Sequence, residues 1–256
     1  PLGQLMHREA MDYFKQYLIV GGMPQAVETY IKTKSFKEVD LIKRDILNLY
    51  KDDIVKYSGD GSIKVQSIFE EIPSQLQKHE KRFSFNSMQK DARYRDYKDA
   101  FFWLQESMIV NIAFNTTEPN IGLRLNRESS ALKCYMGDTG LLLSLAFDEK
   151  GLVDEEIYRK ILFNKLTFNE GMIMENIVAQ MLTATGKKLY FYFNYDKQNS
   201  ANNMEIDFLI AKNKITSKHN ISPLEVKSGK NYTFSSLNKF KNKYKEYSST
   251  AYVLHI

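Results

Sequence analysis

Two short apolar runs near the end of the chain carry charged side chains whose types and spacing could bind a metal ion. Asp207 interrupts the run MEIDFLI, and Glu225 and Lys227 flank Val226 in SPLEVKS. Because side chains alternate across a strand, Glu225 and Lys227 share a face, and neighbouring strands would bring Asp207 to the same patch. Two carboxylates repel each other unless a cation or a proton intervenes. The spacing therefore predicts a Mg²⁺ site made by Asp207, Glu225, waters and the backbone carbonyl of Val226.

A fourth charged residue, Glu175, lies within the apolar stripe of an expected helix. At about 100° per residue, it falls close to Val178, Ala179 and Leu182 on the helix surface. That stripe should pack on the sheet, and a carboxylate buried there needs a partner. The partner that we expect is the same metal site, reached through a water molecule.

The same residues allow an interpretation without a metal ion. Lys227 would then neutralise one carboxylate, and a bound proton would neutralise the other. The cluster would be a salt-bridged structural group, and the sequence leaves both alternatives open.

Basic residues offer three places where the phosphate groups of DNA could bind. Arg93 and Arg95 open an expected helix, Lys239 and Lys243 belong to a later amphipathic helix, and Lys230 lies just beyond the SPLEVKS strand. The alternative for each helix is an ordinary solvated face. Phosphate contacts would give DNA binding that weakens as salt is added.

The positive charge of the chain is concentrated in its last third. Residues 1–165 hold 24 basic and 24 acidic side chains, whereas residues 166–256 hold 12 lysines and 7 acidic side chains. A positive field on one part of a protein favours an anionic partner, of which nucleic acid is the commonest.

Composition excludes several classes of protein. Of the 256 residues, 43% are hydrophobic and 26% charged, which is a globular mixture. A single cysteine, Cys134, allows no internal disulfide, so a reducing, cytoplasmic location is expected. No apolar run reaches the roughly 18 residues of a membrane span, and no signal pattern precedes the first helix. The motif G-x-x-x-x-G-K-[ST] does not occur, so this chain alone should not bind ATP through a P-loop.

Residues 1–165 are expected to form a helical and winged-helix-like domain. Apolar residues recur at helical spacing in HREAMDYFKQYLIV and again in FKEVDLIKRDILNLYKDDIVKY, and the segment from Gly21 to Pro24 separates the helices. The expected inward face of the second of these is Val39, Ile42, Ile46, Leu49 and Tyr50.

Residues 62–128 predict the outline of a winged helix, in which three small helices precede a two-stranded ribbon. Pro73 is expected to start a new turn after the first of them. The apolar stripe of the third is Tyr97, Phe101, Leu104 and Met108. After the ribbon, Asp138 is expected to cap an apolar helix.

Residues 166–256 predict a second domain with the order helix, three strands, helix and strand. NEGMIMENIVAQMLTAT is the first helix, and KLYFYFNY, MEIDFLI and SPLEVKS are the strands. Because a helix, SSLNKFKNKYKEY, separates the last two strands, these should be parallel, and the first three should form an antiparallel meander.

The acid, acid and acid–x–lysine series, together with this order of elements, resembles the PD-(D/E)xK nuclease superfamily. The motif stands here as Glu175, Asp207 and Glu225-x-Lys227, with Ile206 in the place of the usual proline. The resemblance implies that Asp207 and Glu225 bind Mg²⁺ or Mn²⁺, which would activate a water molecule. It also implies catalytic roles for Lys227, which would orient that water or steady the phosphoryl oxygens, and for Glu175.

The resemblance extends over nearly the whole chain. YLIVGGMPQAV, DTGLLLSL, EGMIMENIVAQML, EIDFLI and LEVKSGK are similar to a family of domains of unknown function that follow an AAA-type ATPase domain in bacterial and archaeal proteins. This similarity implies that the chain is the C-terminal part of such a protein. The expected fold is α+β, with a helical, winged-helix-like part before a mixed sheet of PD-(D/E)xK type.

Three functions follow as hypotheses. The first is a divalent-metal-dependent DNA phosphodiesterase controlled by the ATPase. The second is a non-catalytic module that binds DNA or protein and regulates the ATPase through a degenerate nuclease fold. The third is a structural domain that holds a homo-oligomer together.

Overall fold

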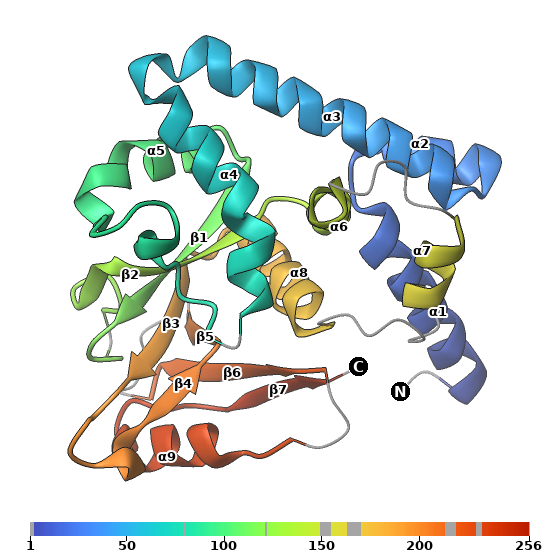
Figure 1. The fold of residues 1–256 in the computed structure, drawn as a ribbon. Helices are drawn as coiled ribbons and strands as arrows, with labels where there is room; N and C mark the ends of the chain where they lie inside the picture. Colours follow the sequence, from blue (N-terminus) through green and yellow to red (C-terminus); the bar gives the residue numbers. More distant parts are fainter. Residues whose placement is uncertain are drawn as a thin grey trace.

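Helices dominate the first half of the chain, and strands gather in the second half (Figure 1). The computed structural model describes residues 3–78, 80–120, 122–148, 155–162, 170–212, 219–228 and 232–255. The described helices are α1 (Gln4–Val20), α2 (Pro24–Thr33), α3 (Phe36–Tyr57), α4 (Ser62–Gln77), α5 (Tyr94–Glu106), α6 (Thr139–Ala146), α7 (Glu155–Leu162), α8 (Glu170–Ala184) and α9 (Ser235–Lys243). The described strands are β1 (Val110–Thr116), β2 (Arg127–Met136), β3 (Leu189–Asn194), β4 (Met204–Ile206), β5 (Phe208–Ala211), β6 (Ile221–Lys227) and β7 (Tyr252–His255).

The breaks between the first helices follow from local chemistry. α1 ends at Gly21, which has a φ of 80° that favours glycine, and its N–H donates to the Tyr17 carbonyl. α2 begins at Pro24, whose fixed φ suits the first turn of a helix. The Ser35 side chain caps α3 by accepting from the Glu38 N–H at 3.3 Å. Among the described helices, none combines the length with the apolar content that a bilayer span needs.

Three expectations for the helical part were wrong in detail. Leu49 is 60% exposed, because the inward face of α3 instead carries the buried charges Asp40 and Lys43. α4 continues through Pro73, since the fully buried side chains around the proline hold both halves of the helix in the core. α5 ends at Glu106, so Met108 lies beyond the helix, with a φ of 57° and 83% of its surface exposed.

Between α4 and α5 the described residues contain a 3₁₀ turn, Phe85–Ser87, in place of the expected middle helix. The two-stranded ribbon does form, because β1 and β2 pair antiparallel from Val110 with Met136 onward. The ribbon is part of a larger sheet and does not project as a free wing, since β1 also pairs in parallel with β3.

The strands form two sheets in the described part of the chain. The first has the order β2-β1-β3-β4, and the second has the order β5-β6-β7. The expected order of helix, three strands, helix and strand is confirmed, as are the antiparallel pairing of β5 with β6 and the parallel pairing of β6 with β7. The single strand expected at MEIDFLI divides into β4 and β5, because the chain bends at Asp207 and passes from one sheet to the other.

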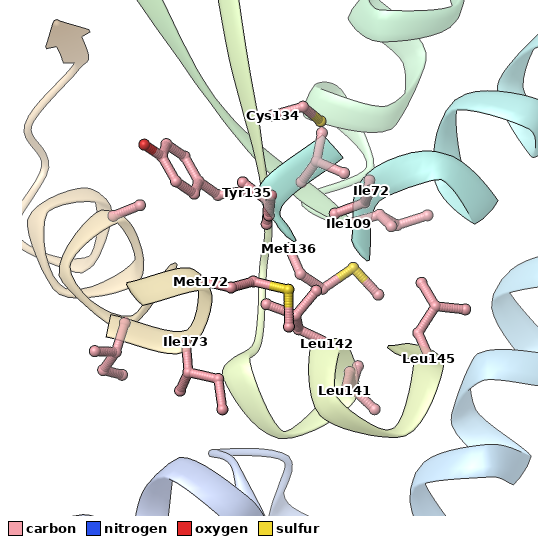
Figure 2. Packing of buried hydrophobic residues seen from close by; sticks show 14 of the residues in the cluster. Ile72, Ile109, Cys134, Tyr135, Met136, Leu141, Leu142, Leu145, Met172 and Ile173 are labelled. Carbon is pink, nitrogen blue, oxygen red and sulfur yellow. The ribbon is translucent and has the colours of Figure 1, made fainter. Parts of the chain in front are cut away.

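The core is continuous across the expected boundary between residues 165 and 166. That boundary lies outside the described residues, but β1 and β3 join the two halves in one sheet. Figure 1 shows α8 lying between this sheet and the N-terminal helices. Figure 2 shows side chains of α4, β2, α6 and α8 meeting in one apolar cluster, with Cys134 and Tyr135 on opposite sides of β2.

A second, smaller apolar cluster lies between the sheets and α9. It contains Ile206, Leu209, Leu237 and Phe240, so the apolar side of α9 packs against the strands. Phe208, Leu224 and Val226 belong instead to the large cluster on the α8 side. The two faces of β5 and β6 therefore pack against different apolar clusters.

Candidate functional site

A buried lysine, Lys133, is the centre of the charged group in this protein. It lies on β2 between Leu132 and Cys134 and has none of its surface exposed. The residue opposite it on β1 is Ala113, and this small side chain leaves room for the lysine stem to cross the sheet. The ammonium reaches a position 5.2 Å from the centre of the Phe191 ring on β3.

Three carboxylates surround the Lys133 ammonium. Its Nζ lies 2.6 Å from Glu205 Oε1, 3.7 Å from Glu175 Oε2 and 3.7 Å from Asp207 Oδ1. We call Lys133, Glu175, Glu205 and Asp207 the acid cluster. Its members come from β2, α8, β4 and the bend that follows β4. Glu205 and Asp207 therefore share one cationic partner.

Glu175 has two further partners. Lys81 Nζ lies 2.5 Å from its Oε1, and the Tyr135 hydroxyl donates to its Oε2 at 3.2 Å. Burial alone would raise the pKa of Glu175, but Lys133 and Lys81 outweigh burial and lower it. Glu175 is buried, as expected, but its described partners are Lys81, Lys133 and Tyr135 in place of the water-bridged metal site that we expected.

Asp207 occupies the bend between the two sheets. Its Oδ2 accepts a hydrogen bond from the backbone N–H of Val226 at 2.8 Å. Burial, and secondly the nearby charge of Glu175, raise the pKa of Asp207 to about 7, although Lys133 and the Val226 N–H oppose the shift. Burial would lower the pKa of Lys133, but the surrounding negative groups raise it well above its ordinary value.

Glu225 and Lys227 form a separate pair. Lys227 Nζ lies 2.8 Å from Glu225 Oε2, and Glu225 is only 1% exposed. Glu225 alternates along β6 with Leu224 and Val226, which face the α8 side, so its side chain faces the α9 side. The four predicted residues are therefore divided between two ion-paired groups.

The donor set can be tested for its fit to a divalent ion. Within the described ranges, no three His, Cys, Asp or Glu side chains gather in a way that could hold a metal ion. In the acid cluster, the place between the carboxylates holds the Lys133 ammonium. The described residues, as arranged, do not fit a resident Mg²⁺ or Mn²⁺.

The basic residues expected to meet phosphates have different surroundings. Arg93 and Arg95 are exposed at the start of α5, where Arg95 lies 3.7 Å from Asp96. Lys239 donates to the Asn203 carbonyl at 3.0 Å, and Lys243 donates to the Tyr192 hydroxyl at 3.1 Å. Lys230 lies outside the described residues.

Sequence reasoning did not identify Lys133, Tyr135 or Lys81 as members of the charged group. The signal for the first two was present in ALKCYM, where a lysine and a tyrosine two positions apart share one face of an otherwise apolar strand. Lys81 comes from a loop and carries no periodic signal.

Comparison with known proteins gives two family matches. Residues 11–151 match the family described as Domain of unknown function (DUF8612), and residues 170–256 match the family described as Domain of unknown function (DUF4143). No curated protein and no solved structure matches the chain. Because the first match covers more than half of the residues of this chain, the chain belongs to the DUF8612 family.

Proposed function

We propose that this chain is a regulatory module of an AAA-type ATPase that binds DNA through a degenerate nuclease fold and does not cut it. The observation that carries the proposal is the Lys133 ammonium within 3.7 Å of three carboxylates. Asp207, one of the two carboxylates expected to bind the ion, already lies 3.7 Å from this ammonium.

The charge balance of the acid cluster supports this proposal. Lys133 and Lys81 set two positive charges against Glu175, Glu205 and Asp207. With its pKa raised to about 7, Asp207 carries a proton in a large fraction of molecules at neutral pH. The cluster is therefore close to neutral by itself, and a divalent ion would add uncompensated positive charge in a buried place.

The ATPase partnership is supported by the match of residues 170–256. The DUF4143 family is known to sit near AAA-type ATPases. The chain carries no P-loop motif, so ATP hydrolysis would belong to the neighbouring domain.

Cleavage and binding assays on one preparation test the proposal. Wild type, Asp207→Ala and Lys227→Ala are incubated with plasmid and labelled oligonucleotides in Mg²⁺ or Mn²⁺. We expect salt-dependent binding by all three proteins and no metal-dependent product. Cleavage by the wild type that both variants lose, with circular dichroism unchanged, would overturn the proposal. Equal cleavage by all three would identify a contaminating nuclease.

The second candidate function is a Mg²⁺- or Mn²⁺-dependent DNA phosphodiesterase. A specific observation favours it, because Glu225 is buried and its Oε1 has no hydrogen-bond partner among the described residues. Glu225 and Lys227 also stand at the motif positions of the nuclease superfamily. The cleavage assay above separates the two candidates.

A further inference from the structure

Two open hollows meet at the turn between α8 and β3. One has a volume of about 320 Å³ and reaches from this turn to β5. The other has a volume of about 640 Å³ and reaches from the same turn to β1 and the end of α5. Residues Gly186 to Tyr190 line both, so the hollows adjoin along one surface. We call them together the basic groove.

The turn presents its lysines for a local structural reason. Gly186 has a φ of 78°, which ends α8, and the Lys187 N–H donates to the Leu182 carbonyl at 3.1 Å. Lys187 and Lys188 therefore follow directly after the C-terminus of α8, where the helix dipole favours positive charge.

Positive side chains predominate in the lining of the groove. Its cations are Arg124, Arg127, Lys187, Lys188 and Lys212. Among the described residues of the lining, Glu106 is the one acidic side chain. No ion pair joins Arg124, Lys188 or Lys212 to a carboxylate within the part of the chain that the structure describes, and all three are exposed. This surface is suited to an anion.

The floor of the groove is apolar and aromatic. Leu189 and Tyr190 form part of it, and the Arg127 guanidinium lies 3.9 Å from the centre of the half-buried Phe114 ring. Burial raises the pKa of Tyr190, whereas Arg127 and Arg124 oppose the shift, which is consistent with both guanidinium groups lying near its hydroxyl. A guanidinium on an aromatic face also offers a plane on which a nucleobase can stack.

The distribution of charge distinguishes between kinds of anion. The cations are spread along two adjoining hollows and do not converge on one point, so they match an extended polyanion better than a single phosphate. The apolar floor matches the exposed bases of a single strand, whereas the bases of a duplex are stacked inside the helix.

We propose that the basic groove binds a single strand of nucleic acid, with Arg124, Lys188 and Lys212 contacting phosphates and a base lying against Arg127 and Phe114. This inference rests on the proposed DNA-binding function and assigns that function a site. The site is distinct from Arg93 and Arg95, which lie at the start of α5.

Fluorescence anisotropy with a labelled single-stranded oligonucleotide tests the groove. The groove variant is Arg124→Gln/Lys188→Gln/Lys212→Gln. The control is Lys34→Gln/Lys37→Gln/Lys56→Gln, which removes the same charge from exposed positions before and along α3. Each lost phosphate contact should reduce the slope of log affinity against log salt by about 0.7, so the groove variant should lose about 2. We also expect at least a tenfold weaker affinity for the groove variant at physiological salt, and an unchanged slope for the control.

Other outcomes distinguish failure of the groove proposal from failure of the proposed DNA-binding function. Wild type that binds no nucleic acid would overturn both the groove and the proposed DNA-binding function. Equal losses in both variants, or a loss in the control alone, would overturn the groove but leave DNA binding intact. Tighter binding of a duplex of the same length would overturn the single-strand assignment. Displacement of the oligonucleotide by polyglutamate at equal charge concentration would point to an acidic protein partner. That result would also overturn the single-strand assignment.

Discussion

The Lys133 ammonium lies 2.6 Å from the Glu205 carboxylate, although the two residues come from β2 and β4 at opposite edges of one four-stranded sheet. The lysine side chain passes over Ala113, its small neighbour on β1, and the Glu205 side chain covers the remaining distance from β4. This contact ties the N-terminal ribbon to the C-terminal strands. It also places a buried ammonium among three carboxylates.

Replacing Lys133 by methionine should strongly destabilise the protein. The substitution keeps the approximate volume but leaves Glu205, Glu175 and Asp207 without their shared cation. Removing one partner from a buried ion pair typically costs about 3–5 kcal/mol. Urea unfolding measures the change, with Lys188→Met as an exposed control that should stay within about 0.5 kcal/mol of the wild type. Adding Glu205→Gln to Lys133→Met should recover part of the loss, and a loss below about 1 kcal/mol for Lys133→Met would contradict the central role of this lysine.

Asp207 should make stability depend on pH. Its pKa of about 7 in the folded state lies above its ordinary value of 3.8, so the folded chain keeps a proton that the unfolded chain releases between these values. Stability should therefore fall as pH rises through that window and level off above about pH 7. Glu175 has a lowered pKa and acts in the opposite direction, but only at more acidic pH.

The measurement is the free energy of unfolding of wild type and Asp207→Asn between pH 5 and pH 8. Below pH 7 the difference between the two proteins should change by about 1 kcal/mol per pH unit, close to the limit of about 1.4 for one proton, and it should level off above pH 7. Groups common to both proteins, including the histidines, cancel in this difference. A difference that stays constant across the range would show that Asp207 does not titrate there.

Gly140 should tolerate no side chain. A Cβ at this position would lie 2.6 Å from the Gly21 backbone and from the Val20 carbonyl oxygen. Gly140→Ala must push α6 away from the end of α1, and overpacking of this kind costs about 1–3 kcal/mol. Gly61→Ala is the matched control, because Gly61 has a helical conformation with nothing within 4 Å of the added atom. Thermal unfolding should show a loss for Gly140→Ala and none for Gly61→Ala; equal midpoints would refute the close approach.

Lys227 should stabilise the protein by pairing with Glu225. Lys227→Met leaves a carboxylate that is 1% exposed without its cation, at a cost of about 1–3 kcal/mol. The exposed Lys241→Met is the control. In the double variant Lys227→Met/Glu225→Gln, much of the loss should return, since the amide carries no charge. A single variant as stable as the control would show that the pair contributes nothing to the fold.

The sequence was sufficient for several of the elements, because each of these depends on local signals. Apolar spacing located α8 and α9, the Gly21–Pro24 segment separated the first helices, and Asp138 caps α6 by accepting from the Leu141 N–H at 2.9 Å, as expected. The parallel pairing of β6 with β7 also followed from the intervening helix. These features need no knowledge of distant contacts.

The bend at Asp207, the burial of Lys43 and the partners of Lys133 could not be predicted in the same way. A lysine within a helix is expected to be solvated. Lys43 is nevertheless fully buried and donates to the Ile19 carbonyl at 2.8 Å. Lys133 becomes the centre of a charged group only when β1 and β3 pair, which joins segments far apart in the chain. The pairing of strands far apart in the chain determines which charged residues come into contact. A local sequence pattern does not predict that pairing.

Calorimetric titration of Mn²⁺ into wild type and Asp207→Asn tests the central claim most directly. If Lys133 already neutralises the acid cluster, the two proteins should give the same heats and show no stoichiometric binding that depends on Asp207. Binding of one Mn²⁺ by the wild type that Asp207→Asn abolishes, with both proteins folded, would contradict the account and favour the metal-dependent phosphodiesterase.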